Sequence, residues 1–295
     1  MSLRDALAEG SGSAPPRGSR GGTLFRLVSA GYSYPDGHEA LRDVSLAILQ
    51  GESVVVLGAN GCGKSTLLWV LAGLRFVTTG SVEAFGEPLT EAALRDEGAA
   101  RMFRQRVGLV FQNADAQLFS PTVRDELVFG PLHLGLPPAE IHRRVEDVAR
   151  LLGLGRVLDR SPYHLSGGEK RRAAIGAVLT SNPQVLLLDE PSAGLDPRSR
   201  HQIVELLIRL RRAGKTIVTS THDLEIAEAI GSRAVVLSED HVVAADRPIA
   251  AVLDDLELLR SVNLVHDHWH RHGDAAHAHD HAHVGEHEHD HHSDA

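Results

Sequence analysis

The chain has 295 residues, of which 42% are hydrophobic and 23% charged, and its formal net charge is −9. This composition is typical of a globular protein that buries a core, and the acidic balance argues against a nucleic-acid-binding surface. The single cysteine, Cys62, excludes an intrachain disulfide and favours a reducing compartment. No apolar run reaches the ~18 residues of a membrane span, and residues 1–22 lack the apolar core of a signal peptide. Any role at a membrane is therefore expected to come through a partner.

Residues 1–22 are rich in Gly, Ser, Pro and Arg, which predicts a disordered leader; a membrane-surface arm is the alternative. Apolar runs then predict strands at 24–28 and 44–48, on either side of the turn at 35–37. Tyr32 and Tyr34 lie between these two strands. Either tyrosine could stack on a purine or pack in a sheet, and spacing alone does not choose between them.

The first chemical motif is a glycine-rich loop at 58–66, which follows an apolar strand at 53–57 and opens a helix predicted from Ser65 to Leu74. Strand, loop and helix form the setting in which the pattern G-x-x-x-x-G-K-[ST] binds phosphate. Backbone N–H groups of the loop and the helix N-terminus would cradle the anion, while Lys64 reaches the β- and γ-phosphates. An ordinary glycine turn is the alternative, but one of only three lysines in the chain falls at the required position. The expected nucleotide-binding residues of the loop are Gly58, Asn60, Gly61, Gly63, Lys64, Ser65 and Thr66.

A further apolar strand at 106–111 ends at Gln112. Mainly helical stretches at 122–134 and 138–152 follow, and they interrupt an otherwise alternating pattern of strands and helices. The small-residue turn Leu165-Ser166-Gly167-Gly168-Glu169 then opens a helix predicted over 170–179.

Two strand ends in the second half of the chain carry polar side chains. The apolar run 185–188 suits a parallel strand buried on both faces, and Asp189 and Glu190 follow it directly. Ligands of open α/β sheets bind at the carboxyl ends of the strands, so Asp189 is predicted to hold Mg²⁺ and Glu190 to polarise an attacking water. The strand predicted at 216–220 leads to His222, which can contact a γ-phosphate; a capping histidine is the alternative.

With these motifs in place, residues 23–246 resemble the ATP-binding-cassette ATPases. The motifs stand in that family's order: a Walker A loop at 58–66, the glutamine loop at Gln112, the signature at 165–169, Walker B ending at Asp189 and Glu190, a D-loop at 192–196 and the switch histidine His222. The resemblance implies an α/β fold with a P-loop NTPase (RecA-like) core, an antiparallel β subdomain and an inserted α-helical subdomain at about 113–180. A short helical extension is expected at 247–263.

The resemblance also implies how the site works. Two subunits, as a homodimer or with an unequal partner, would close head to tail on two ATP molecules. Each site would take Walker motifs from one subunit and Ser166, Gly167 and Gly168 from the other. Tyr34 stands where the family places its adenine-stacking aromatic, which resolves the choice against Tyr32. The implied catalytic residues are Lys64, Gln112, Glu190 and His222, and the implied Mg²⁺ ligands are Ser65, Gln112 and Asp189.

Within the family, the segments 111–123 and 129–136 are similar to those of energy-coupling-factor importers, in particular cobalt and nickel uptake ATPases. That resemblance implies a transmembrane coupling subunit contacted by a short helix at 115–119, a membrane substrate-binding subunit, and a peripheral position on the cytoplasmic face of the membrane. The same ATPase serving a vitamin or zinc is the alternative. A DNA-repair or translation factor is disfavoured because the chain has neither a long coiled-coil insert nor a second cassette, and a metal-storage protein would leave the catalytic set idle.

The end of the chain, residues 264–295, holds twelve histidines, most of them alternating with acidic or small residues. Such a segment buries too little apolar surface to fold by itself, so a disordered tail is predicted. Imidazole and carboxylate groups suit Ni²⁺, Co²⁺ or Zn²⁺, while a solubilising tail is the alternative. The candidate metal ligands are His266, His268, His270, His272, His277, His279, His281, His283, His287, His289, His291 and His292.

Overall fold

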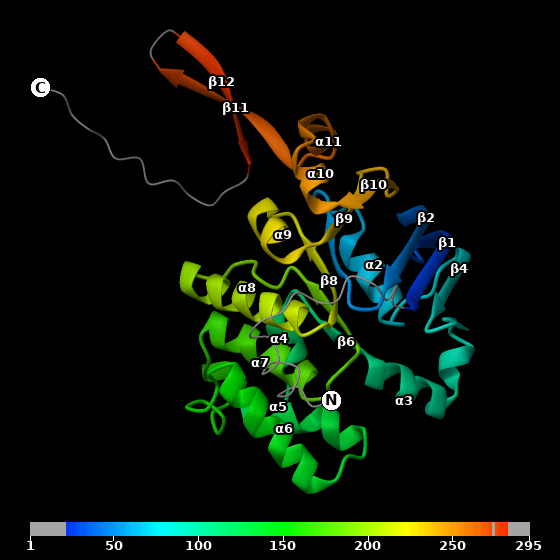
Figure 1. Ribbon diagram of the computed structural model, residues 1–295, viewed down its shortest axis with the longest axis vertical. Helices are drawn as coiled ribbons and strands as arrows, with labels where there is room; N and C mark the ends of the chain where they lie inside the picture. The colour runs from blue at the N-terminus through cyan, green and yellow to red at the C-terminus, as the bar shows by residue number, and fades with distance from the viewer. Residues whose placement is uncertain (1–21, 273–274, 283–295) are drawn as a thin grey trace, which may run out of the picture.

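The structure is a computed structural model that describes residues 22–272 and 275–282 (Figure 1). The predicted leader therefore lies outside the described residues, apart from Gly22.

A six-stranded sheet forms the centre of the fold, and five of its strands run parallel to one another. Every residue of β3 (Ser53–Leu57), β7 (Val185–Asp189) and β8 (Thr216–Thr221) is buried, as expected for strands covered on both faces. The sixth strand pairs antiparallel with its neighbour. In spatial order the strands are β6 (Val107–Val110), β7 (Val185–Asp189), β8 (Thr216–Thr221), β3 (Ser53–Leu57), β9 (Arg233–Leu237) and β10 (Val243–Pro248).

A second, antiparallel sheet lies beside the centre, with α2 (Lys64–Leu71) between the two (Figure 1). One hydrophobic core joins this sheet, α2 and one face of the central sheet. The first strand of this antiparallel sheet, β1 (Thr23–Ser33), is longer than the predicted strand at 24–28. It includes Tyr32, which packs in the shared core. In spatial order the strands are β2 (Glu39–Leu49), β1 (Thr23–Ser33), β4 (Thr79–Ala84) and β5 (Glu87–Pro88).

Helices cover the other face of the central sheet and form a second core with it. A short connection, η1 (Ala93–Arg95) and α3 (Glu97–Arg106), leads into β6. Between β6 and β7 lie α4 (Ala114–Gln117), α5 (Val123–His133), α6 (Pro138–Leu151), η2 (Pro162–His164) and α7 (Gly167–Leu179). The helices α8 (Pro197–Arg212) and α9 (Leu224–Ile230) follow β7 and β8. The predicted α/β fold, with its antiparallel sheet and added helices, is thereby confirmed.

The helix α7 begins three residues earlier than predicted, because Ser166 caps it. The Ser166 hydroxyl accepts a hydrogen bond from the Glu169 amide, and the Glu169 carboxylate accepts one from the Ser166 amide, which completes a capping box. Gly167 and Gly168 are thereby the first two residues of the helix.

The last part of the described chain contains the short helices α10 (Ile249–Leu253) and α11 (Leu256–Ser261) and the antiparallel strands β11 (Val265–His272) and β12 (Ala275–Ala282). The two strands differ from the disordered tail predicted from residue 264. Alternation of histidine with other residues has the period of two that a strand also has, and composition alone does not carry this information. Residues 273–274 and 283–295 lie outside the described residues. In the part of the chain that is described, no helix combines the length and apolar character that crossing a membrane requires.

Arg233 on β9 ties the two sheets together. Its side chain is 19% exposed and donates hydrogen bonds to Glu52 at 2.7 Å, to Asp246 at 2.5 Å and to the backbone carbonyl of Ala47 on β2 at 2.9 Å.

Replacing Arg233 leaves two acidic side chains and a carbonyl without this donor. We expect Arg233→Ala to lower the free energy of unfolding by about 2–3 kcal/mol in urea denaturation. The control Arg26→Ala removes an exposed pair with Glu83 at 3.9 Å and should cost less than about 1 kcal/mol. Equal costs for the two variants would contradict this role.

Candidate nucleotide site

The phosphate loop owes its shape to glycines at two crowded positions. Gly58 has φ +148°, and a Cβ there would lie 2.5 Å from the Leu237 carbonyl oxygen. Gly63 has φ +107°, and its Cβ would lie 2.2 Å from the carbonyl oxygen of Ala40. Because Gly63 is also the N-cap of α2, no side chain caps the amides of the first helical turn. The free amides of that turn fit an anionic group such as a phosphate.

Cys62 lies inside this loop as a packing residue. Its side chain is buried, and burial raises the pKa of the thiol even though Lys64 acts in the opposite direction. The thiol therefore remains protonated near neutral pH and behaves as a small apolar group rather than a nucleophile.

Lys64 lies at the start of α2 with its side chain almost fully buried. Its Nζ donates hydrogen bonds to the carbonyl oxygens of Gly58 at 2.8 Å and Ala59 at 3.0 Å. The same nitrogen lies 3.7 Å from Glu190 Oε1, and both side chains are no more than 7% exposed. The ammonium is thus held at the mouth of the loop by backbone carbonyls and one carboxylate, all of which a phosphate can replace.

The acidic pair stands at the carboxyl end of β7. Ser220 on β8 lies opposite Asp189 in the sheet register, and its hydroxyl donates to Asp189 Oδ1 at 2.6 Å. The Glu190 amide donates to the Ser220 carbonyl at 3.2 Å, and Glu190 has φ +43°, a left-handed conformation that is costly for a residue with a side chain. The turn aims the buried Glu190 carboxylate at Lys64. The sequence reasoning missed Ser220, although its place at the end of the neighbouring parallel strand is the signal that marks it.

His222 completes the polar group. Its Nδ1 lies 3.0 Å from Glu190 Oε1, and this hydrogen bond raises the pKa of the imidazole, while partial burial opposes the shift. His222 and Lys64 therefore both approach the same oxygen of the Glu190 carboxylate, Oε1.

These residues surround a pocket of about 430 Å³. Tyr34 lines it, with its hydroxyl 3.0 Å from Thr66 Oγ1, whereas Tyr32 is buried in the core. His38 stacks on Tyr34 with ring centroids 6.3 Å apart and was not predicted; its place just after the turn at 35–37, close to Tyr34, is the only sequence signal for it. The lining residues are Tyr34, His38, Ala40, Asn60, Gly61, Gly63, Lys64, Ser65, Thr66, Gln112 and Glu190.

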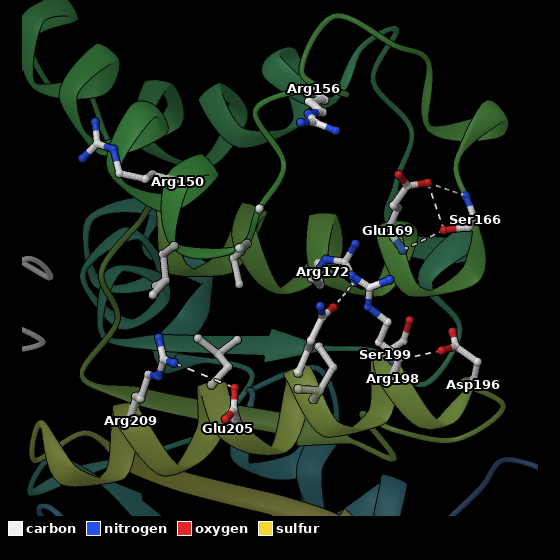
Figure 2. A pocket seen from close by; sticks show the side chains of 16 residues that line it. Arg150, Arg156, Ser166, Glu169, Arg172, Asp196, Arg198, Ser199, Glu205 and Arg209 are labelled. Carbon is white, nitrogen blue, oxygen red and sulfur yellow. Dashed lines mark hydrogen bonds and ion pairs between the residues drawn. The ribbon is translucent and has the colours of Figure 1, made fainter.

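Several predicted residues border this pocket or lie elsewhere. Gly58 and His222 contact the lining residues Lys64 and Glu190 without lining the pocket themselves. Asp189 directly precedes Glu190 and is hydrogen-bonded to Ser220. Ser166 lines a different pocket of about 720 Å³, between α6, α7 and α8, and the two pockets share no lining residue. Figure 2 shows Ser166 and Glu169 at one end of this second pocket, with Arg172, Asp196 and Ser199 beside them. The side chains of the predicted tail ligands lie outside the described residues, and the described part of the chain holds no group of three or more His, Cys, Asp or Glu residues placed for a metal.

Fold and pocket define a P-loop nucleotide-binding protein, because a lysine, an acidic pair and a histidine meet at the glycine-rich loop on the carboxyl edge of a parallel sheet. Residues 41–193 match the family model described as ABC transporter. The chain belongs to the ABC transporter family and is an ATP-hydrolysing cassette of that family.

Individual relatives agree with this assignment. A nickel import ATP-binding protein of Rhodobacter capsulatus is 47% identical over 82% of this chain and 95% of the relative. An energy-coupling factor transporter ATP-binding protein of Methanothermobacter thermautotrophicus is 42% identical over 82% of this chain and 76% of the relative. Among solved structures, cbiO1 from Clostridium perfringens, described as part of the ABC transporter complex cbiONQ, has a TM-score of 0.70 and 34% identity over 82% of this chain and 95% of that one.

The pair formed by His222 and Glu190 predicts a pH-dependent stability. Because the folded-state pKa of His222 is raised, its stabilising effect is fully present below the unfolded value of ~6.5 and is lost as the pH rises through the folded-state pKa. His222→Ala should therefore destabilise the protein more at pH 6 than at pH 9, measured as urea-unfolding free energies. The exposed pair His201–Glu205 provides the control, since His201→Gln should change stability by less than about 0.5 kcal/mol at pH 6. A cost of His222→Ala that grows with pH would contradict the assignment.

Proposed function

We propose that this chain is the ATPase subunit of a membrane importer of transition-metal ions, nickel or cobalt, and that it works as a dimer with ATP at the interface. The observation that carries the ATPase part is the convergence of Lys64, Glu190 and His222 on the pocket of the phosphate loop. The same energy-coupling ATPase serving a vitamin or zinc is the second candidate.

The predicted residues at and beside the pocket have the following proposed roles in nucleotide binding and hydrolysis. Lys64 and the amides of the first turn of α2 bind the β- and γ-phosphates, and Tyr34 stacks on the adenine. Ser65, Gln112 and Asp189 offer the hydroxyl, amide and carboxylate oxygens that suit Mg²⁺, which when bound neutralises phosphate charge. Glu190 orients and polarises the attacking water. His222 holds Glu190 and contacts the γ-phosphate as the site closes.

A dimer is proposed because one chain separates the two halves of the site. The signature residue Ser166 and the phosphate loop belong to pockets without a common residue. A second chain, identical or related, would supply Ser166, Gly167 and Gly168 to the γ-phosphate bound by the first. A Cβ atom added at Gly167 would meet no other atom within 4 Å, so the backbone there is open to such a partner.

Coupling to a membrane subunit is proposed at the surface formed by α5 and by the connection that joins α4 to it, which contains Phe119. Phe119 and Phe129 are 62% and 40% exposed and meet edge to face at 4.9 Å, and Leu132 adds a further exposed apolar side chain. An exposed apolar cluster of this kind marks an interaction surface. A transmembrane coupling subunit would dock here, with a membrane substrate-binding subunit beside it. The chain would then sit peripherally on the cytoplasmic face of the membrane, with no role in nucleic-acid binding.

The metal substrate is supported by the nickel import relative and by the histidine-rich end of the chain. The substrate is read by another subunit in this proposal, and the tail would collect or buffer the ion.

The role of Glu190 is tested by Glu190→Gln, which keeps the shape of the side chain but removes the carboxylate. We expect the variant to bind ATP with an affinity within about threefold of the parent chain and to lose at least about 100-fold in kcat, because general-base assistance is worth that much. An ATP-bound dimer should accumulate, as measured by light scattering. The matched control is Lys64→Ala, which should lose ATP binding itself. Near-normal hydrolysis by Glu190→Gln would show that the base has been assigned wrongly.

The tail is tested by a chain that ends at Leu264. We expect this chain to hydrolyse ATP normally and to lose tight binding of Ni²⁺ or Co²⁺ in calorimetric titration. In the full chain, metal affinity should fall as the pH drops below ~6.5, because protonated imidazoles do not bind metal. Equal metal binding by the two chains, or an affinity that is flat between pH 5 and 8, would contradict a metal-binding tail.

A further inference from the structure

Two consecutive residues of α7 hold the segment 111–117, which leaves β6 and carries Gln112. Lys170 Nζ lies 2.6 Å from Asp115 Oδ1. Arg171 donates hydrogen bonds to the carbonyl oxygens of Phe111 at 2.9 Å and Gln112 at 2.6 Å.

A third contact joins the same two elements, but here the side chain belongs to the segment 111–117 and the backbone carbonyl to α7. The side chain of Gln117 donates to the Ala174 carbonyl on α7 at 2.9 Å and accepts from the Phe111 amide at 3.0 Å. The first turns of α7 and the segment 111–117 are therefore fastened by hydrogen bonds on both sides.

Arg171 is the principal member of this set. Its side chain is buried, whereas Asp115 is 62% exposed, and exposed ion pairs contribute less than about 1 kcal/mol. The guanidinium donates hydrogen bonds to two backbone carbonyls, and its Nε has no hydrogen-bond partner. Burying a cation with an unpaired donor destabilises the fold, so stability alone does not account for Arg171. We therefore assign it the role of fixing the position of the two carbonyl groups that it holds.

The fastened elements serve different nucleotide sites. Gln112 lines the pocket of the phosphate loop, while Ser166 caps the N-terminus of α7 and lines the other pocket. A nucleotide that shifts the backbone of Gln112 must shift Arg171, and with it the helix that begins at the signature turn. Gly168 transmits this shift to α8 as well, because a Cβ there would lie 2.1 Å from Ser199 Oγ.

We propose that Arg171 is a positioning residue that couples the two halves of the subunit. The nucleotide bound in a subunit's own pocket sets, through Gln112 and Arg171, where that subunit holds Ser166 for its partner's ATP. This coupling rests on the proposed dimeric ATPase. It makes the occupancy of one site felt at the other without contact between the two nucleotides.

The test compares Arg171→Gln with the parent full-length chain. We expect the Kd for ATP to stay within about twofold and kcat to fall at least about tenfold, because closure rather than nucleotide binding is impaired. Arg171→Lys keeps one donor group that can reach a single carbonyl and should recover part of the lost kcat. A purely structural defect would change Kd and melting temperature together and would not be rescued in this graded way.

Arg144→Gln is the matched control. Arg144 lies on α6 and also donates to a backbone carbonyl, that of Thr180, at 3.1 Å, but it does so at the far end of α7. This variant should keep kcat within about twofold. If Arg171→Gln does not fold, Gln117→Met decides instead, since it removes the contact with Ala174 at similar side-chain volume and should show the same split between Kd and kcat.

A folded Arg171→Gln chain with kcat within twofold of the parent overturns the coupling, as does an equal loss in Arg144→Gln. Failure of the proposed function gives a different result, because the unsubstituted chain would then bind ATP but show no hydrolysis, alone or with its membrane complex.

Discussion

The structure depends on the approach of Lys64 to Glu190, two buried charges 3.7 Å apart that come from distant parts of the sequence. They meet because β3 and β7 both pair with β8 in a parallel sheet, so that their carboxyl ends share one edge. Neither charge can be buried alone without a large desolvation cost. The two side chains therefore depend on one another at the pocket, where phosphate can take the place of Lys64's present partners.

The arrangement of the remaining motifs follows from this edge. Gln112 stands at the end of β6, beside β7, and so reaches the same pocket. The signature turn begins α7 and lines a different pocket (Figure 2). In the proposed dimer, each chain would contribute one half to each of two sites. Arg171 joins these halves within the chain. Hydrolysis on this account is a property of two chains, and the hydrogen bonds within each chain decide how they respond to one another.

The sequence predicted those features that are written in local patterns. The loop at 58–66 and the buried strand before Asp189 combine a strict motif with an unbroken apolar run, and both were found where expected. Ser220, His38 and Arg171 were not found, because their contacts arise from sheet register or from packing between elements far apart in sequence. Spacing alone did not separate Tyr34 from Tyr32: the family resemblance favoured Tyr34, and in the structure Tyr34 lines the pocket while Tyr32 is buried in the core. The strands β11 and β12 were missed because the prediction weighed apolar content and not backbone pairing.

Complementation between two inactive chains tests the central claim most directly. Lys64→Ala disables the phosphate loop, and Gly167→Asp places a carboxylate in open space where the partner's γ-phosphate would bind. Neither variant should hydrolyse ATP alone, but their mixture should recover activity, because one of the two sites in a mixed dimer has both halves intact. If the unsubstituted chain is active and the mixture stays as inactive as its components, ATP is not shared between two chains and the account is wrong.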